Sequence, residues 1–148
     1  MTLHFEDMTV GRVFELGSTA VTEGEIVDFA SRFDPQPFHI DPAAATDTIY
    51  GGIIASGWHS CSMLMRLMVD GMIGDSSSMG SPGMDEVRWP APVRPGDTLT
   101  GTATIVGARR SASKPDRGIV EILNELRNQD DVVVVSMRGT GFYACRDA

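Results

Sequence analysis

Asp34 and His39 are the residues whose types and spacing best suit acid–base chemistry. They belong to the stretch Asp34-Pro35-Gln36-Pro37-Phe38-His39, whose two prolines stiffen the backbone and disfavour a helix. A carboxylate and a neutral imidazole can relay protons near neutral pH, and together they can hold one water molecule. Taken singly, each residue suits a structural role better, Asp34 in a local turn and His39 as a partly buried ring. Their combination in one rigid loop favours catalysis.

Gly57 is a second candidate because it lies at the start of the longest helical pattern in the sequence. The first backbone N–H groups of a helix lack partners within the helix and carry partial positive charge. Glycine lets the carbonyl oxygen of a ligand approach such donors closely, as in an oxyanion hole. The alternative is an ordinary flexible helix entry, which a glycine taken alone would favour.

Two short helices are predicted on either side of the Asp34–His39 loop. Thr22 and Glu25 fit a capping box, and apolar residues at helical spacing follow, so a helix is predicted over 23–32. Asp41 followed by proline is typical of another helix start, and this brief helix should end near residue 46 or 47. The first helix thus leads directly to Asp34.

The central helix is predicted over 56–72, and its apolar residues cover most of its circumference, which predicts burial on most sides. A Ser/Gly/Pro-rich loop over 74–83 separates it from segments that alternate as strands. Strands are predicted at 13–14 with 18–22, 84–93, 98–107, 119–127 and 132–144, with polar connections at 109–118 and 128–131. Pro90 and Pro92 predict a bend or a sheet edge in the second of these. This order predicts an α+β fold in a single domain, 1–148.

Composition narrows the class of protein. At 148 residues with a net charge of −8, the chain suits one globular domain, and the charge disfavours nucleic acid and anionic membranes as partners. No apolar run approaches a membrane span and no signal peptide is visible, so a cytoplasmic protein is expected. Cys61 and Cys145 are interpreted as buried thiols, and because no Cys/His cluster is present, no metal site is expected.

Three stretches resemble the MaoC-like dehydratases, the family of (R)-specific enoyl-CoA hydratases. The Asp34–His39 segment resembles the family motif G-D-x-N-P-[LI]-H without gaps. Ile54-Ala55-Ser56-Gly57-Trp58 is similar to the family's I-A-H-G-M, and residues 88–98 are similar to F-x-x-P-V-x-x-G-D-T. The resemblance extends from about Val13 to Tyr143.

The resemblance implies a hot-dog fold, in which an antiparallel sheet wraps around one long central helix. It implies reversible hydration of 2-enoyl-CoA to (R)-3-hydroxyacyl-CoA, with Asp34 and His39 as the catalytic dyad and the Gly57 amide as oxyanion donor. It also implies a homodimer, or a dimer of dimers, formed through the sheets. No cofactor is implied beyond the CoA of the acyl-CoA thioester substrate.

Several positions depart from the family pattern or could contact substrate. Phe33 replaces a glycine, Gln36 an asparagine, and Met65 a helix serine that in some hydratases bonds to the aspartate. Ser56 and Trp58 flank Gly57 and are expected to contact the substrate. Arg109, Arg110 and Lys114 belong to the one basic cluster, for which binding of CoA phosphates and an ordinary solvated loop are equally weighted.

Three alternatives remain open at this point. A hot-dog thioesterase would hydrolyse the thioester, but such enzymes generally lack the D-x(4)-H dyad. A non-catalytic acyl-thioester binding subunit is compatible with the departures at Phe33, Gln36 and Met65. A dehydratase acting on acyl carrier protein is the third, although an acidic surface suits an acidic carrier poorly.

Overall fold

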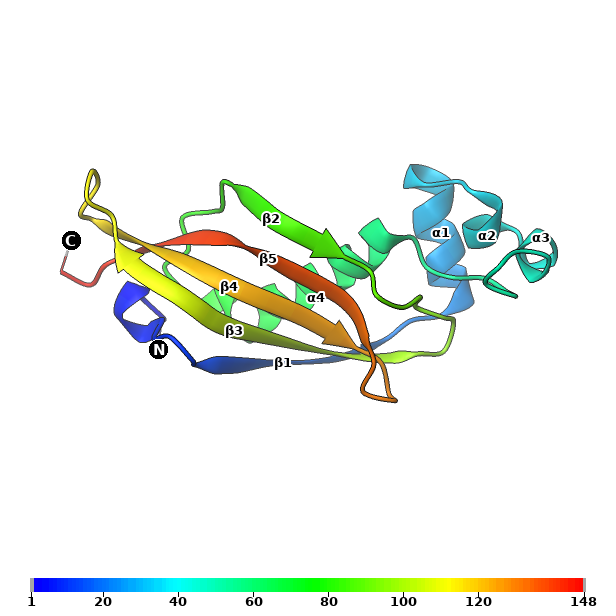
Figure 1. Cartoon of the computed structure of the whole chain (residues 1–148), viewed down its shortest axis with the longest axis horizontal. Coiled ribbons are helices and arrows are strands. Elements are labelled where there is room, and N and C mark those ends of the chain that lie inside the picture. Colours follow the sequence, from blue (N-terminus) through cyan, green and yellow to red (C-terminus); the bar gives the residue numbers. More distant parts are fainter. Residues whose placement is uncertain (1, 148) are drawn as a thin grey trace.

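The computed structural model describes residues 2–147 and places a five-stranded antiparallel sheet against one long helix (Figure 1). The strand order is β1-β3-β4-β5-β2, so β1 and β2 form the two edges. The strands are β1 (Val13–Ala20), β2 (Gly83–Arg88), β3 (Thr98–Arg110), β4 (Arg117–Arg127) and β5 (Val133–Ala144). The helices are α1 (Glu23–Phe33), α2 (Pro37–Ile40), α3 (Pro42–Thr46) and α4 (Gly57–Gly71), with 3-10 turns η1 (Phe5–Asp7) and η2 (Ile73–Asp75). The predicted α+β organisation is confirmed.

The core lies between α4 and one face of the sheet. On β4 every second side chain is buried, as expected for a strand with one face against a hydrophobic layer. From α4, Leu64, Leu67 and Met68 are buried in the same cluster. The helix contacts β1, β3, β4 and β5, so the sheet curves along its length. Each fully buried aliphatic side chain of this kind stabilises the fold by roughly 1.5–3 kcal/mol.

The prediction that α4 is buried on most sides is wrong for the single chain. Trp58, Met65 and Val69 lie on the side away from the sheet and are 60, 44 and 38% exposed. One sheet covers only one side of a helix, so the second apolar side is left open. Neighbouring exposed apolar side chains of this kind are typical of an interaction site.

Proline residues explain two differences between the predicted and the observed ends of helices and strands. The stretch 34–39 was expected to be free of helix, yet Pro37 begins α2. Proline is tolerated at the first helical position because its missing N–H would have no helical partner there. The strand predicted over 84–93 ends instead at Arg88, before Pro90, and its position at the sheet edge agrees with the prediction. Strands β3 and β4 also extend into the predicted 109–118 loop.

Helix α1 carries the capping box predicted from sequence. The Thr22 hydroxyl accepts a hydrogen bond from the Glu25 amide at 3.1 Å, and the Glu25 carboxylate accepts one from the Thr22 amide at 3.1 Å. We expect Thr22→Ala to lower the free energy of unfolding by about 1 kcal/mol because one helix donor loses its partner. Urea denaturation measures this change.

A matched control for this cap is Thr46→Ala. The exposed Thr46 hydroxyl bonds only to the Pro42 carbonyl of its own helix. Its loss should change the free energy of unfolding by no more than about 0.5 kcal/mol. Equal effects of the two substitutions would contradict a specific role for the Thr22 cap.

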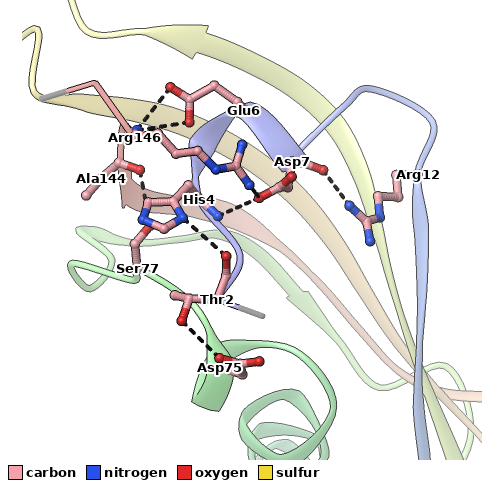
Figure 2. A network of polar contacts seen from close by, with 9 residues as sticks. All are labelled: Thr2, His4, Glu6, Asp7, Arg12, Asp75, Ser77, Ala144 and Arg146. Atoms are coloured by element: carbon pink, nitrogen blue, oxygen red, sulfur yellow. Dashed lines mark hydrogen bonds and ion pairs between the residues drawn. The ribbon is translucent and has the colours of Figure 1, made fainter.

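The N-terminal segment is fastened to the end of the sheet farthest from α1, α2 and α3 (Figures 1 and 2). The Arg146 guanidinium contacts the Asp7 carboxylate, which also accepts the His4 amide at 2.8 Å. The Arg146 backbone amide donates to the Glu6 carboxylate at 3.2 Å. The Arg146 hydrogen bond, followed by the His4 amide, holds the pKa of Asp7 below its ordinary value.

Candidate active site

Helices α1 and α2 bring Asp34 and His39 together. Asp34 caps the C-terminus of α1, where its amide donates to the Ala30 carbonyl at 2.7 Å. Four-residue α2 then turns the chain, so that His39 Nε2 lies 3.2 Å from Asp34 Oδ2. His39 Nδ1 lies 2.7 Å from the Ile54 carbonyl oxygen. Because a carbonyl only accepts hydrogen bonds, Nδ1 carries a proton, and Nε2 lies at hydrogen-bond distance from the Asp34 carboxylate.

Two side chains fix the Asp34 carboxylate from opposite sides. The Gln36 amide donates to Oδ1 at 2.7 Å, and the Ser56 hydroxyl donates to Oδ2 at 2.7 Å. Burial raises the pKa of Asp34, but the hydrogen bonds from Gln36 and Ser56, with the nearby His39 ring, hold this pKa below its ordinary value. Asp34 is therefore an ionised acceptor across the neutral pH range.

Gly57 begins α4 and lies under the indole ring of Trp89. The Trp89 Nε1–H donates to the Gly57 carbonyl at 2.9 Å. A β-carbon at position 57 would lie 2.5 Å from a ring carbon of Trp89, closer than van der Waals contact allows. The Ser56 hydroxyl bonds to Asp34 and makes no cap bond to α4. Glycine is thus required here for the close approach of an aromatic ring.

These groups share one cleft of about 400 Å³, here called the Asp34 cleft. Its polar side holds Asp34 and His39, and its apolar sides come from α4 and the chain between β2 and β3. The lining includes Asp34, His39, Gly57, Trp58, Trp89 and Pro92. A cleft that is mostly apolar with a few convergent polar groups is typical of a small-molecule site.

The sequence of this chain is similar to those of known proteins. A family model described as a MaoC like domain matches residues 6–125. The chain belongs to the MaoC-like family. The uncharacterized protein YdeM of Bacillus subtilis (strain 168) is 30% identical over 133 residues, which are 89% of this chain and 92% of that protein. The (R)-specific enoyl-CoA hydratase of Rhodospirillum rubrum is 31% identical over 110 residues, 70% of each chain.

A solved structure confirms the fold of this MaoC-like protein. The MaoC-like dehydratase from Rhodospirillum rubrum superposes with a TM-score of 0.90 at 37% identity, covering 97% of this chain and 98% of that chain. The hot-dog fold predicted from the sequence is therefore confirmed. Among the described residues, no helix is long and apolar enough to cross a membrane.

The basic cluster, for which CoA-phosphate binding and an ordinary solvated loop were both considered, lies far from the Asp34 cleft within one MaoC-like chain. Arg109 and Arg110 end β3, and Lys114 lies in the following turn, at the opposite end of the sheet from α1 (Figure 1). Arg110 is paired with Asp147 at 2.9 Å. Only the positive charge of these residues suggested that they belong to the site. The thirteen residues of β3 separate this end of the sheet from the end that carries the Asp34 cleft.

The side chain of Ser56, which was expected to contact the substrate, is fully buried and donates its hydrogen bond to Asp34. Trp58 does border the cleft. Phe33 and Met65, which depart from the family pattern, border a separate groove, whereas Gln36 bonds directly to the Asp34 carboxylate. Of the three departures, only Gln36 therefore contacts Asp34.

Trp89 and His59 also lie at or beside the site of this MaoC-like chain. The sequence does not predict the contact of Trp89 with Gly57, because nothing in its local pattern shows that it crosses the start of α4. His59 stacks on Phe29 of α1, with ring centroids 4.7 Å apart. Desolvation lowers the pKa of His59, while nearby Glu25 opposes this effect.

The Ser56 hydrogen bond predicts a change in pH dependence. Because the pKa of Asp34 is depressed in the fold, its ionised form stabilises the protein above the unfolded pKa, and this stabilisation is lost as the pH falls through the folded value. In Ser56→Ala the carboxylate loses one donor, so its pKa should rise toward the ordinary value. The acid limb of the pH–rate profile for enoyl-thioester hydration should therefore move to higher pH.

Ser62→Ala is the matched control, since the Ser62 hydroxyl donates only to the Trp58 carbonyl of α4. Its pH–rate profile should coincide with that of the unsubstituted protein. An unchanged acid limb in Ser56→Ala would show that the ionisation of Asp34 does not control the rate.

Proposed function

We propose that the protein hydrates 2-enoyl-CoA thioesters to (R)-3-hydroxyacyl-CoA and catalyses the reverse dehydration. The observation that carries this proposal is the paired carboxylate and imidazole at the cleft, with Asp34 Oδ2 and His39 Nε2 3.2 Å apart. At this distance both groups can contact one water molecule, and a carboxylate with an imidazole can relay its protons. The likeness to the (R)-specific hydratase of Rhodospirillum rubrum supports the same reaction.

The held water supplies the nucleophile. With both hydrogens directed at Asp34 and His39, its lone pair faces the cleft and the β-carbon of the enoyl group. As the oxygen–carbon bond forms, His39 Nε2 takes one proton, and the resulting imidazolium lies beside ionised Asp34. The same proton is then delivered to the α-carbon on the same face. General acid–base catalysis of this kind contributes about two to four orders of magnitude.

The second part of the reaction is stabilisation of the thioester oxygen. Electrons of the broken carbon–carbon double bond move to this oxygen, which becomes enolate-like before the α-carbon is protonated. The Gly57 amide, at the positive end of α4, is the proposed donor. One oxyanion donor contributes roughly 3–4 kcal/mol to lowering the barrier.

The test is incubation of the protein with but-2-enoyl-CoA, following loss of the enoyl absorbance and the configuration of the 3-hydroxybutyryl-CoA formed. Hydration to the (R) product is expected. Release of free thiol without loss of the enoyl group would instead identify a thioesterase. Tight binding of the thioester without any turnover would identify a non-catalytic binding subunit.

The proposal includes a second copy of this chain as partner. Among the described strands, β2 pairs only with β5, so its other edge is open beside the exposed side of α4. Open strand edges and exposed apolar surface both favour association. We infer that two chains pair through β2 and cover Val69 of α4.

Sedimentation velocity should therefore give twice the chain mass of 15.9 kDa, or a multiple of that dimer. Val69→Glu should shift the protein toward the monomer by burying a carboxylate in the interface. Val132→Glu is the matched control, because Val132 is similarly exposed in the turn between β4 and β5. A monomer at micromolar concentration in the unsubstituted protein would contradict this assembly.

A further inference from the structure

A second, smaller cavity lies between the later turns of α4 and the inner face of the sheet. Its volume is about 160 Å³, close to the roughly 150 Å³ of a protein cavity that accommodates benzene. It is lined by methionine and isoleucine side chains, backbone glycines and a few neutral polar groups, among them Met65, Met68, Ile73, Met84, Asn124 and Tyr143. None of its lining residues is charged. We call it the Asn124 cavity.

Asn124 is the unusual member of this lining. It belongs to the buried row of β4, where the neighbouring inward positions are Ile122 and Leu126, and it is 1% exposed. Its register partners are Ala103 on β3 and Met137 on β5, which offer no side-chain hydrogen bond. Among the described residues, its Oδ1 has no hydrogen-bond partner. Buried amides in folded proteins are nearly always paired, so this one calls for a partner from outside the chain.

The Asn124 cavity and the Asp34 cleft each share lining residues with one groove on the outer side of α4. An apolar groove of about 640 Å³ runs between α1, α4 and β2. Trp58 borders both the cleft and this groove, and Met65 and Met84 border both the groove and the cavity. The helix rise places Met65 about 10 Å beyond Trp58. Unbranched methionine side chains at the cavity entrance can move aside for a ligand.

We propose that the Asn124 cavity binds the far end of a long acyl chain and that Asn124 Oδ1 accepts a hydrogen bond from a hydroxyl group carried there. This assignment rests on the proposed function and names its substrate class, an enoyl thioester of medium to long chain hydroxylated near its end. A carboxylate or ammonium at the chain end is disfavoured because the cavity offers no opposite charge. The methylene groups between the two ends occupy the apolar groove, which the second copy would cover.

The test compares binding of two saturated thioesters, ω-hydroxydodecanoyl-CoA and dodecanoyl-CoA, by isothermal titration calorimetry. Saturated chains cannot be hydrated, so affinity is measured without turnover. The unsubstituted protein should bind the hydroxylated thioester about tenfold more tightly, because an otherwise unpaired buried amide gains its partner. In Asn124→Leu, which continues the apolar row of β4, this preference should disappear or reverse. Equal affinities in the unsubstituted protein, or a preference that persists in Asn124→Leu, would overturn the assignment.

Ser62→Ala is the matched control, since Ser62 offers a hydroxyl in the groove but does not line the cavity. It should retain the tenfold preference, and loss of the preference in this variant alone would place the hydroxyl in the groove and overturn the proposal. Asn124→Ala, with a smaller side chain, replaces Asn124→Leu if the latter fails to fold by circular dichroism.

A separate assay distinguishes failure of this inference from failure of the proposed function. Hydration of but-2-enoyl-CoA, whose chain is too short to reach Met65, should have the same kcat/KM in Asn124→Leu and in the unsubstituted protein. Hydration without any preference for the hydroxylated chain would uphold the hydratase and reject the cavity assignment. A preference in binding without hydration would uphold the cavity and reject the hydratase.

Discussion

Replacing His39 with alanine is expected to lower kcat for hydration of but-2-enoyl-CoA by at least two to four orders of magnitude. The imidazole is the group proposed to take the proton of water and return it to the α-carbon, and no other described histidine borders the Asp34 cleft. Asp34→Asn should have a similar effect, since its carboxamide presents an N–H in place of one acceptor and cannot stabilise the imidazolium. Initial rates of enoyl loss measure both.

The controls for these two variants are His4→Ala and Asp28→Asn. His4 lies at the far end of the sheet, and Asp28 lies on α1 outside the cleft. Both should retain the rate of the unsubstituted protein. Thermal unfolding of all four variants establishes that the fold is intact. If His39→Ala and Asp34→Asn each keep more than a tenth of the activity, the two residues are not the catalytic dyad.

The parts of the fold that the sequence predicts well are those specified by short-range signals. The Thr22 capping box fixes the start of α1, and the alternation of β4 fixes which side chains face the core. The Asp34–His39 pair is predictable for the same reason, because both residues lie in one short segment whose prolines restrict its shape. Local geometry alone brings these two side chains within reach of each other.

The parts that the sequence does not predict depend on contacts between distant segments. Trp89 reaches Gly57 across thirty-two positions, and Ser56 bonds to Asp34 across twenty-two. The resemblance directed attention to position 65 for a serine that bonds to the aspartate, but the hydroxyl that donates to Asp34 belongs to Ser56 at the N-cap of α4. Residue-by-residue comparison at Met65 misses this hydrogen bond.

The apolar surface of α4 shows another limit of prediction from the sequence. Its composition indicates burial on several sides, but a pattern of side chains cannot say whether the covering surface belongs to the same chain, to a second copy or to a ligand. The structure separates these cases. The sheet covers Leu64 and Leu67, whereas Trp58 and Met65 face the open groove.

Gly57→Ala is expected to lower kcat for enoyl-thioester hydration by about a hundredfold or more, because it disturbs the proposed oxyanion donor without removing it. The added methyl carbon would lie 2.5 Å from the Trp89 ring. Either the indole leaves its hydrogen bond to the Gly57 carbonyl or the start of α4 shifts. A shift of about 1 Å at a catalytic donor can cost a hundredfold in rate.

A double-mutant cycle separates this steric cause from a general loss of stability. Trp89→Leu alone removes the indole from above Gly57 and should lower kcat by less than tenfold, since Trp89 donates no hydrogen bond to the proposed reacting atoms. In the Gly57→Ala, Trp89→Leu double variant the added methyl group has space, so the rate should return to within about tenfold of Trp89→Leu. Such recovery would be a strong positive coupling between two contacting residues. If the losses in the two single variants simply multiply, then the close approach of Trp89 does not explain the glycine, and the requirement at position 57 comes from the ligand itself.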